Sequence, residues 1–418
     1  MKVIRVKNAD SFARPKEPSY NKKLVESIID QVRKSGDTAL RKFEAKFNGV
    51  SIKTLQVSKK EIHDAYQSVT REQMTAISMA KDNLARTELA LKKQLKEIRI
   101  DSNGIKIVKS FSALDCVGCY VPGGLARYPS SAVMSVVPAK VAGVQKIIVV
   151  TPPNKQGGVD PTVLVAADMC GADLIFKVGG AHAIAALAYG TKSIPPVDKI
   201  VGPGGPFVTA AKYLVSSVTS IDMLAGPTEL AIIADDSADP EFVALDLISQ
   251  SEHSADTTCC LITTSKKLAD SVNEIITKST SIQRKEIVLS SLNKNGFVAL
   301  CDKMSDAINV ANKLAPEHLE IITRQPQKLA KQIKSAGLIL LGKNTPSAAS
   351  DYLLGTNHVL PTNRFGKSRG SLSVLDFMKI QTTVESSRNA LERIDKKLET
   401  LTTSESLPNH YLAVRKRL

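Results

Sequence analysis

The 418-residue sequence contains no tryptophan, and aromatic residues make up only 4% of it. It also lacks any run of 18 apolar residues, which is the length that a membrane-spanning helix needs, so we expect no membrane partner. The first ten residues, MKVIRVKNAD, contain neither the apolar stretch nor the cleavage site of an export signal. We therefore expect a cytoplasmic protein.

Cysteine is also scarce, and the six cysteines are scattered through apolar segments, as is typical of reduced thiols in a cytosolic protein. Cys116 and Cys119 form one CxxC pair. A single pair cannot complete a tetrahedral metal site, so we interpret both as small buried hydrophobic residues. The HExxH pattern of zinc proteases is absent too.

The net charge of +15 would suit a nucleic-acid-binding protein. The lysines, however, are spread along predicted helices such as residues 21–34 and 91–96 and form no dense tract. Few aromatic residues are present to stack on bases. The pattern favours a solvated basic surface, and we expect no nucleic-acid partner.

The hydrophobic pattern predicts helices over most of the first hundred residues. Apolar residues recur at helical spacing over residues 24–32, and a longer helical stretch covers residues 59–96. Residues 98–111 are typical of a hairpin that turns at Ser102-Asn103-Gly104.

From residue 115 onward, short apolar strands alternate with helices, which is typical of a mostly parallel sheet. We expect strands at 117–121, 146–151, 174–178 and 199–201, and helices at 131–142, 161–170, 181–189 and 207–217. The pattern restarts after residue 222, with strands at 229–234, 258–264, 296–300 and 338–341 and a helix at 240–251. These elements predict an α/β protein with two Rossmann-like domains. The last 45 residues are expected to form helices (374–380 and 384–401) without a sheet, docked on another surface.

Three glycine-rich turns follow predicted strands in the middle of the chain. They are Val121-Pro122-Gly123-Gly124, Val178-Gly179-Gly180 and Gly202-Pro203-Gly204-Gly205-Pro206. Glycine lets the backbone approach a ligand closely, and the N-termini of the following helices favour phosphate. None of the turns matches GxGxxG, and each alone suits a plain strand-to-helix turn equally well. Three turns on one side of a sheet favour a nucleotide cleft.

The histidines have suggestive neighbours, apart from His63, which we interpret as structural. Gln250 and His253 lie three residues apart on one predicted helix, so they share a face. The other pairs and single residues are Glu317 with His318, Asp351 with His358 on either side of a glycine turn, and His410 in the C-terminal tail. Nitrogen and oxygen donors of this kind suit zinc, although the spacing alone leaves structural roles open.

Five segments together closely resemble the histidinol dehydrogenase family, in that family's order and spacing. They are Tyr120-Val121-Pro122-Gly123-Gly124, Asp222-Met223-Leu224-Ala225-Gly226-Pro227-Thr228-Glu229, Ser249-Gln250-Ser251-Glu252-His253, Ala315-Pro316-Glu317-His318-Leu319, and Asp351 followed by Gly355-Thr356-Asn357-His358-Val359-Leu360-Pro361-Thr362. The resemblance extends from about Ser27 to His410, which is nearly the whole chain.

The resemblance implies an aldehyde-dehydrogenase-like architecture with small helical N- and C-terminal extensions. The expected parts are an N-terminal extension (1–18), a first α/β domain with the metal and catalytic residues (19–114 plus 229–372), a second α/β domain on the NAD side (115–228), and a helical tail that reaches the partner subunit's site (373–418). The implied reaction is the zinc-dependent, NAD-linked oxidation of L-histidinol through L-histidinal to L-histidine, which ends histidine biosynthesis.

The resemblance also implies roles for individual residues. One zinc ion per subunit would be held by Gln250, His253, Asp351 and, from the partner subunit of a homodimer, His410. Its main task would be to orient the substrate, whose imidazole and amine complete the metal shell. The substrate-contacting positions are the four metal ligands together with Thr228, His318, His358 and Glu405, of which Glu405 again comes from the partner. Thr228 replaces the family's usual serine and keeps its hydroxyl group.

The expected chemistry agrees with these residue types. Alcohol oxidation needs a base for the hydroxyl proton, and a histidine that titrates near neutrality, His318, suits this role. The aldehyde must be hydrated before the second oxidation, and the neighbouring carboxylate of Glu317 can activate that water. NAD accepts the hydride in both steps.

Two departures from the family pattern fall in the NAD-contacting set, whose third member is Tyr120. His182 stands where the family usually has glutamine, and Gly205 stands where it usually has asparagine. Each lost amide removes a hydrogen bond worth about 1 kcal/mol net, so we expect altered cofactor affinity or pose. Three alternatives remain at this stage: a related zinc dehydrogenase acting on another amino alcohol or diol, a zinc hydrolase with Glu317 as base, and a basic nucleic-acid-binding protein.

Overall fold

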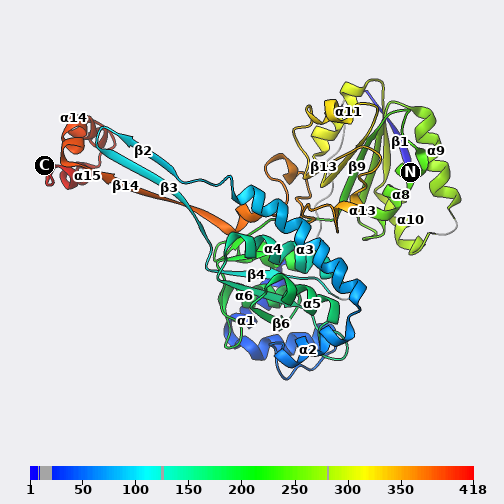
Figure 1. The fold of residues 1–418 in the computed structure, drawn as a ribbon, viewed down its shortest axis with the longest axis horizontal. Coiled ribbons are helices and arrows are strands. Elements are labelled where there is room, and N and C mark those ends of the chain that lie inside the picture. The colour runs from blue at the N-terminus through cyan, green and yellow to red at the C-terminus, as the bar shows by residue number, and fades with distance from the viewer. Residues whose placement is uncertain (8, 10–20, 124–126, 280–281) are drawn as a thin grey trace.

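The computed structural model describes residues 1–7, 9, 21–123, 127–279 and 282–418. They form two α/β lobes and a long arm that projects away from both (Figure 1). Each lobe contains a parallel sheet, so the prediction of two Rossmann-like α/β domains is confirmed. Much of the N-terminal extension expected over residues 1–18, and Gly124 of the first glycine turn, lie outside the described residues.

The five-stranded lobe contains the middle of the chain, with its parallel strands in the order β6-β5-β4-β7-β8. Its elements are β4 (Cys116–Tyr120), α4 (Pro129–Ala142), β5 (Lys146–Thr151), α5 (Pro161–Cys170), β6 (Leu174–Lys177), α6 (Gly180–Tyr189), β7 (Lys199–Val201), α7 (Pro206–Val215) and β8 (Ser220–Ile221). All but the two-residue β8 were predicted. Helices cover the sheet on both faces, which explains the continuous apolar run of β5.

The N-terminal helices also pack on the five-stranded lobe. They are α1 (Lys22–Phe43), the π-helical turn η2 (Glu44–Asn48), α2 (Lys59–Ser68) and α3 (Arg71–Lys92). The apolar face of α1 lies against α6 and α7, while α2 packs on α5 and α3 on α4. This packing differs from the expected grouping of residues 19–114 with 229–372. Sequence periodicity identifies a helix's buried face but not the sheet that covers it.

The six-stranded lobe has the strand order β1-β11-β10-β9-β12-β13, with all strands parallel. Its elements are β1 (Lys2–Val6), β9 (Glu229–Ala234), α8 (Pro240–Ser251), β10 (Thr258–Thr263), α9 (Lys266–Lys278), α10 (Lys285–Lys294), β11 (Phe297–Cys301), α11 (Met304–Leu314), β12 (His318–Ile322), α12 (Pro326–Ala330), β13 (Leu338–Leu341) and α13 (Ser347–Ser350). The sequence did not predict β1 or β12. Residues 2–6, expected in an N-terminal extension, instead add the edge strand β1 beside β11.

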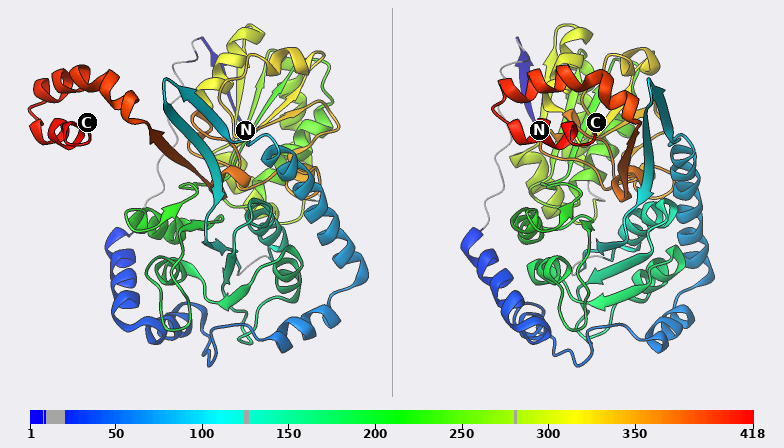
Figure 2. Two further views of the ribbon diagram at one scale, coloured as in Figure 1. Left: turned by 60° about the vertical axis from the view of Figure 1, so that its left-hand side comes forward. Right: turned by 90° about the vertical axis from the view of Figure 1, so that its left-hand side faces the viewer.

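The arm is a three-stranded antiparallel sheet that carries two helices at its far end (Figures 1 and 2). Its elements are β2 (Ile98–Ser102), β3 (Ile105–Ala113), β14 (Met378–Ser386), α14 (Arg388–Ser404) and α15 (Pro408–Arg415); the short turns η3 (Phe365–Lys367) and η4 (Val374–Phe377) precede β14. The predicted hairpin is confirmed, with positive φ angles at Asn103 and Gly104.

The C-terminal tail differs from the expectation of helices without a sheet. Helices were predicted over 374–380 and 384–401, but β14 crosses both predictions and pairs with β3 along its whole length. Its β-branched residues, such as Thr382 and Val384, favour a strand. Because all but the first of its side chains are exposed, β14 lacks the alternation that marks a half-buried strand.

Other expectations concern single residues and the membrane. Cys119 is fully buried and Cys116 is partly buried, as expected of small hydrophobic residues. His63 lies on the exposed face of α2. No helix among the described residues is long and apolar enough to cross a membrane.

Candidate active site at the junction of the lobes

The residues predicted to be catalytic lie at the amino-terminal edge of the six-stranded sheet. β12 begins at His318, which lies opposite Leu230 of the neighbouring strand β9. Residues 222–228 lead directly from β8 of the other lobe to the start of β9. This edge therefore faces the carboxyl-terminal edge of the five-stranded sheet, where the glycine-rich turns lie. The two sets of motifs therefore lie at the junction between the lobes, where His358 and Asn357 contact α4 of the five-stranded lobe.

A partly buried hydrogen bond joins His318 to Asp351. Nε2 of His318 donates to Oδ1 of Asp351 over 3.1 Å, and Nδ1 of His318 lies 4.0 Å from Oε2 of Glu317. Asp351 is positioned by the short helix α13, which ends one residue before it. His318 is 2% exposed, and its Nδ1 has no hydrogen-bond partner among the described residues. That nitrogen is available to a ligand.

Burial and mutual charge shift the pKa values of this group. Burial lowers the pKa of His318, but the hydrogen bond to Asp351 and the charge of Glu317 outweigh it and raise the pKa to about 9. Burial raises the pKa of Glu317 to about 8, against the opposing charge of His318. For Asp351, burial acts upward, but the hydrogen bond and charge of His318 hold its pKa below the ordinary value. Both values lie above neutrality, so the two groups exchange protons with a substrate most readily at mildly alkaline pH.

Gln250 lies at the carboxyl end of α8, but His253 lies outside this helix, so the prediction that both share one helix is wrong for His253. Gln250 is 1% exposed, and its amide nitrogen has no hydrogen-bond partner among the described residues. His253 follows the helix in a turn where part of its side chain is exposed. Desolvation by the surrounding groups nevertheless lowers its pKa and favours the neutral imidazole, which is the form that binds a metal. His253 and Asp351 also interact electrostatically, so α8 and α13 present these donors to the same region.

His358 bridges the two lobes. Its Nδ1 donates to the main-chain carbonyl of Asp351 over 2.8 Å, and its Nε2 lies 3.3 Å from Oγ of Ser131 on α4. Burial lowers the pKa of His358, so its Nε2 accepts from the hydroxyl group. The neighbouring Asn357 donates its side-chain amide to the carbonyl of Met134, also on α4. The loop after Asp351 is thereby held against the five-stranded lobe.

The remaining substrate-site predictions fall into two groups. Thr228 ends the segment between the lobes, directly before β9, and is partly buried. Glu405 caps α14 and His410 lies on α15, at the far end of the arm and away from both lobes of this chain (Figure 1). The structure therefore brings together Gln250, His253, Asp351, His318 and His358, but it separates Glu405 and His410 from them.

The positions expected to contact NAD lie at the ends of three neighbouring or nearby strands of the five-stranded sheet. Tyr120 ends β4 and is 5% exposed, and its hydroxyl accepts from the main-chain N–H of Gly180 over 3.1 Å. His182 lies on the first turn of α6, is 2% exposed and donates to Glu44. Gly205 caps α7 with open space around its Cβ position and a φ of −67°, so the backbone here accepts asparagine without strain.

Comparisons with known proteins agree with the motifs. The sequence profile described as histidinol dehydrogenase matches residues 13–418. A histidinol dehydrogenase of Clostridium acetobutylicum is 45% identical over 398 residues, covering 94% of this chain and 92% of the relative. One from Methanocaldococcus jannaschii is 43% identical over 395 residues, covering 94% and 92%. The chain belongs to the histidinol dehydrogenase family.

The fold of this family is also that of the chain. The crystal structure of histidinol dehydrogenase from Elizabethkingia anophelis matches with a TM-score of 0.92 and 32% identity, covering 100% of this chain and 97% of that one. Membership makes the chain an oxidoreductase of histidine biosynthesis.

The donor set expected for zinc can be tested against the geometry. Among the described residues, no group of three His, Cys, Asp or Glu side chains has the arrangement of a metal site. The expected zinc ligands differ from such a group, because Gln250 would bind through its amide oxygen and His410 lies on the arm. A neutral His253 and an ionised Asp351, together with the amide oxygen of the buried Gln250, are donors that fit a site that an ion and another subunit complete.

Sequence reasoning missed two buried acids, Glu229 and Glu44. Glu229 hydrogen-bonds to the catalytic candidate Glu317, and Glu44 to the cofactor candidate His182. Glu229 belongs to one of the family-like segments and precedes a strand with no other charge, which was a usable signal. Glu44 is on an otherwise ordinary amphipathic stretch and gave none.

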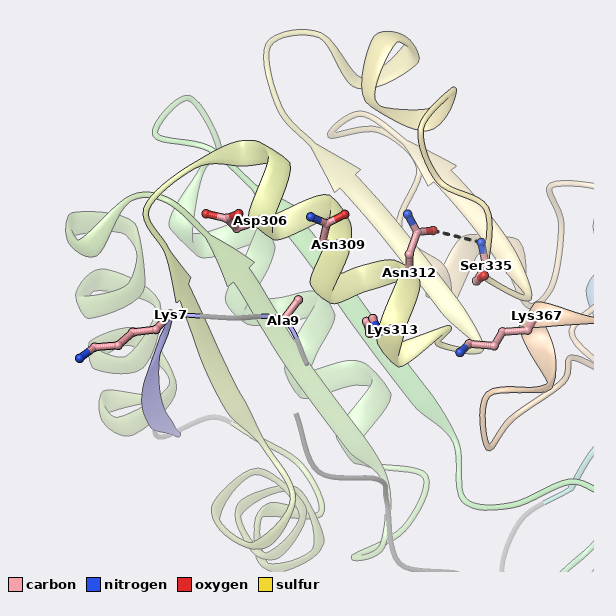
Figure 3. A pocket seen from close by; sticks show the side chains of 8 residues that line it. All are labelled: Lys7, Ala9, Asp306, Asn309, Asn312, Lys313, Ser335 and Lys367. Carbon is pink, nitrogen blue, oxygen red and sulfur yellow. Dashed lines mark hydrogen bonds between the residues drawn. The ribbon is translucent and has the colours of Figure 1, made fainter. Parts of the chain in front are cut away.

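The six-stranded lobe also has a separate hollow of about 610 Å³ on its surface (Figure 3). It is lined by Lys7, Ala9, Asp306, Asn309, Asn312, Lys313, Ser335 and Lys367. Asn312 spans part of it, accepting from the main-chain N–H of Ser335 over 3.2 Å. None of the predicted site residues lines this hollow.

Proposed function

We propose that this member of the family oxidises L-histidinol through L-histidinal to L-histidine in the cytoplasm, with NAD as hydride acceptor and one zinc ion per subunit. The observation that carries the proposal is the buried Glu317–His318–Asp351 group at the junction of the lobes. In this group His318 is the base for the first oxidation and Glu317 is the base for the second. The group faces the edge of the other lobe where the glycine-rich turns lie.

Zinc would be held by Gln250, His253 and Asp351 and by His410 of the partner subunit. When bound, it orients the substrate through the substrate's imidazole and amine. The lowered pKa values of His253 and Asp351, which favour the neutral imidazole and the ionised carboxylate, support this assignment. His358 is hydrogen-bonded to the main chain of Asp351, and Thr228 directly precedes Glu229, which is hydrogen-bonded to Glu317; both would hold the substrate's polar groups.

His318 would take the hydroxyl proton in the first oxidation through its unpartnered Nδ1. Its Nε2 is bound to Asp351, which fixes the ring orientation. Glu317 would remove a proton from the water that hydrates the aldehyde. Its Oε2 lies 4.0 Å from Nδ1 of His318. The short separation allows one buried pair to serve both oxidations in turn.

NAD, when bound, supplies the hydride acceptor. The open turn at Gly205, at the N-terminus of α7, is the most accessible of the expected contacts. Tyr120 and His182 are already engaged within the protein, so they would support the glycine turn more than touch the cofactor.

We further propose a homodimer in which each arm completes the partner's site. The arm has exposed apolar side chains that a partner would cover: Ile98, Ile100, Ile380, Val384, Leu401, Leu407 and Leu412 are each at least 40% exposed. Such a surface is typical of an interface. The same arm carries Glu405 and His410, which have no role near this chain's own lobes.

The deciding experiment follows NADH absorbance when histidinol is added to the purified protein, with zinc and after its removal. The proposal predicts two NADH formed per histidinol and loss of activity without zinc. A matched set of other amino alcohols and diols controls for specificity. If one of these is oxidised with a higher kcat/KM than histidinol, the substrate assignment is wrong.

A further inference from the structure

Glu229 and Glu317 form two reciprocal hydrogen bonds. The main-chain N–H of Glu229 donates to Oε2 of Glu317 over 2.9 Å, and the main-chain N–H of Glu317 donates to Oε2 of Glu229 over 3.3 Å. The residues lie opposite each other at the starts of β9 and β12, one step before the first paired residues Leu230 and His318. Both side chains are less than a tenth exposed. Each carboxyl group therefore satisfies a main-chain donor at the edge of the sheet.

A third hydrogen bond connects Glu229 to the loop that carries His358. The main-chain N–H of Asn363 donates to Oε1 of Glu229 over 3.1 Å. Asn363 has a φ of 52°, in the left-handed region that asparagine tolerates better than most residues. Glu229 therefore joins three segments of the site. The first is its own segment, which also contains Thr228; the second is the start of β12; and the third is the end of the loop that follows Asp351.

We propose that Glu229 is a positioning residue that orients the carboxyl group of Glu317 for its role as base in the aldehyde step. The inference rests on the proposed function. The side chain of Glu229 accepts the main-chain N–H of Glu317 and so fixes the backbone from which the Glu317 side chain projects. The main-chain N–H of Glu229 holds Oε2 of Glu317, which leaves Oε1 for the water. Without this support, the side chain of Glu317 would rotate among several conformations and would lose the orientation that the reaction needs.

The charges support the geometry. Burial raises the pKa of Glu229 to about 7, and Glu229 is one of the groups that raise the pKa of Glu317. The other charged groups that act on Glu317 are His318 and Asp351; His318 also acts on Glu229. Because two neighbouring carboxyl groups resist joint ionisation, Glu229 also influences the pH at which Glu317 becomes a base.

The alternative is that Glu229 only anchors the ends of two strands. A structural anchor would affect both oxidations and the stability alike. A positioning residue would affect the aldehyde step selectively and would change its pH profile. Glu88 offers a matched control, because it is also buried and accepts a main-chain N–H, from Val374 over 2.6 Å, in the other lobe.

The test supplies histidinol and histidinal separately to the full-length, zinc-loaded protein at saturating NAD. Glu229→Ala keeps the main-chain N–H that binds Oε2 of Glu317 but removes the side-chain acceptor of the main-chain N–H groups of Glu317 and Asn363. We expect it to lower kcat for histidinal by about 10- to 100-fold, the range for removing a supporting partner, with a smaller effect on histidinol and on KM. Glu229→Gln removes the neighbouring charge but keeps one acceptor, so kcat should recover partly and the acidic limb should move to lower pH by about half a unit. Glu88→Gln should leave the profile unchanged.

An infrared titration of the carboxyl groups, with Glu317→Gln to assign the bands, reads the same coupling without any turnover. A wild-type protein that does not oxidise histidinol would refute the proposed function, while the infrared shift would still decide the coupling. Equal losses in both half-reactions with an unmoved pH profile, or an infrared band of Glu317 that is unaffected by Glu229→Gln, would overturn the inference.

Discussion

Nε2 of His182 lies 2.8 Å from Oε1 of Glu44, and neither side chain is more than 2% exposed. The same oxygen of Glu44 accepts the main-chain N–H of Gly179 over 2.7 Å, and the ring of Phe43 lies 5.5 Å from the imidazole. The family's usual glutamine is therefore replaced here by a histidine that is turned toward an acid inside the protein. The acid also occupies a main-chain donor of the second glycine turn.

This contact refines the expected weakness of NAD binding. His182→Gln alone would leave the buried Glu44 short of a partner, at a cost of about 1–3 kcal/mol in the free energy of unfolding. The pair must change together, so we predict that Glu44→Gln/His182→Gln/Gly205→Asn binds NAD more tightly than wild type by about 10-fold, or roughly one hydrogen bond. Asparagine fits at Gly205 because open space surrounds its Cβ position. Calorimetric titration of the folded protein measures the affinity, and unchanged or weaker binding would reject the account.

The second prediction concerns the substitution of a proposed zinc ligand, His253. His253→Ala should lose bound zinc in elemental analysis and should abolish the zinc-dependent rise in Tm, because a ligand that binds only the folded state stabilises it. His63→Ala is the matched control, since His63 lies on the exposed face of α2. Full histidinol oxidation by a protein shown to contain no zinc would contradict the assignment.

The third prediction concerns the arm. His410→Ala and His253→Ala subunits should each be inactive, but a hybrid dimer contains one intact site. Random exchange makes half of the dimers hybrids, so the mixture should recover about a quarter of the wild-type activity. Exchange is confirmed by mass spectrometry of labelled subunits. No recovery despite confirmed exchange would exclude shared sites.

The fourth prediction separates the half-reactions. Glu317→Gln keeps the shape of the side chain but removes its basicity, so histidinal oxidation should slow by about 10²–10⁴-fold while histidinol oxidation slows less. His318→Ala should slow the first step instead. Stopped-flow NADH formation with each substrate at saturating NAD distinguishes them. Normal histidinal turnover by Glu317→Gln would remove Glu317 from its role.

The five-stranded lobe could be predicted from the sequence because the strands of this lobe are continuous apolar runs between glycine and proline residues. β14 was missed because its exposed side chains carry no alternation, and its partner β3 is distant in sequence. The family-like segments identified the candidate residues of the site, but not the buried acids Glu229 and Glu44 that are hydrogen-bonded to them. Glu229 and Glu317 are 88 residues apart, and Glu44 and His182 are 138 apart. Pairings of this kind depend on the tertiary fold and leave no local pattern.

The last prediction follows from the raised pKa values. In the folded protein Glu317 keeps its proton up to a pKa of about 8, whereas an unfolded glutamate loses it near the ordinary value of 4.5. Between these values the native state binds more protons, so the free energy of unfolding falls as pH rises, by up to about 1.4 kcal/mol per unit. Glu229, with a pKa of about 7, acts in the same direction.

Replacing the acid removes its share of this slope. In the zinc-free protein, Glu317→Gln should therefore lose less stability than wild type between pH 5 and pH 8, while Glu229 maintains the remaining slope. Denaturant unfolding at each pH measures the difference, and Glu286→Gln, at an exposed position, serves as the control. Parallel wild-type and Glu317→Gln curves across this range would mean that Glu317 is already ionised at neutral pH and would contradict the raised pKa.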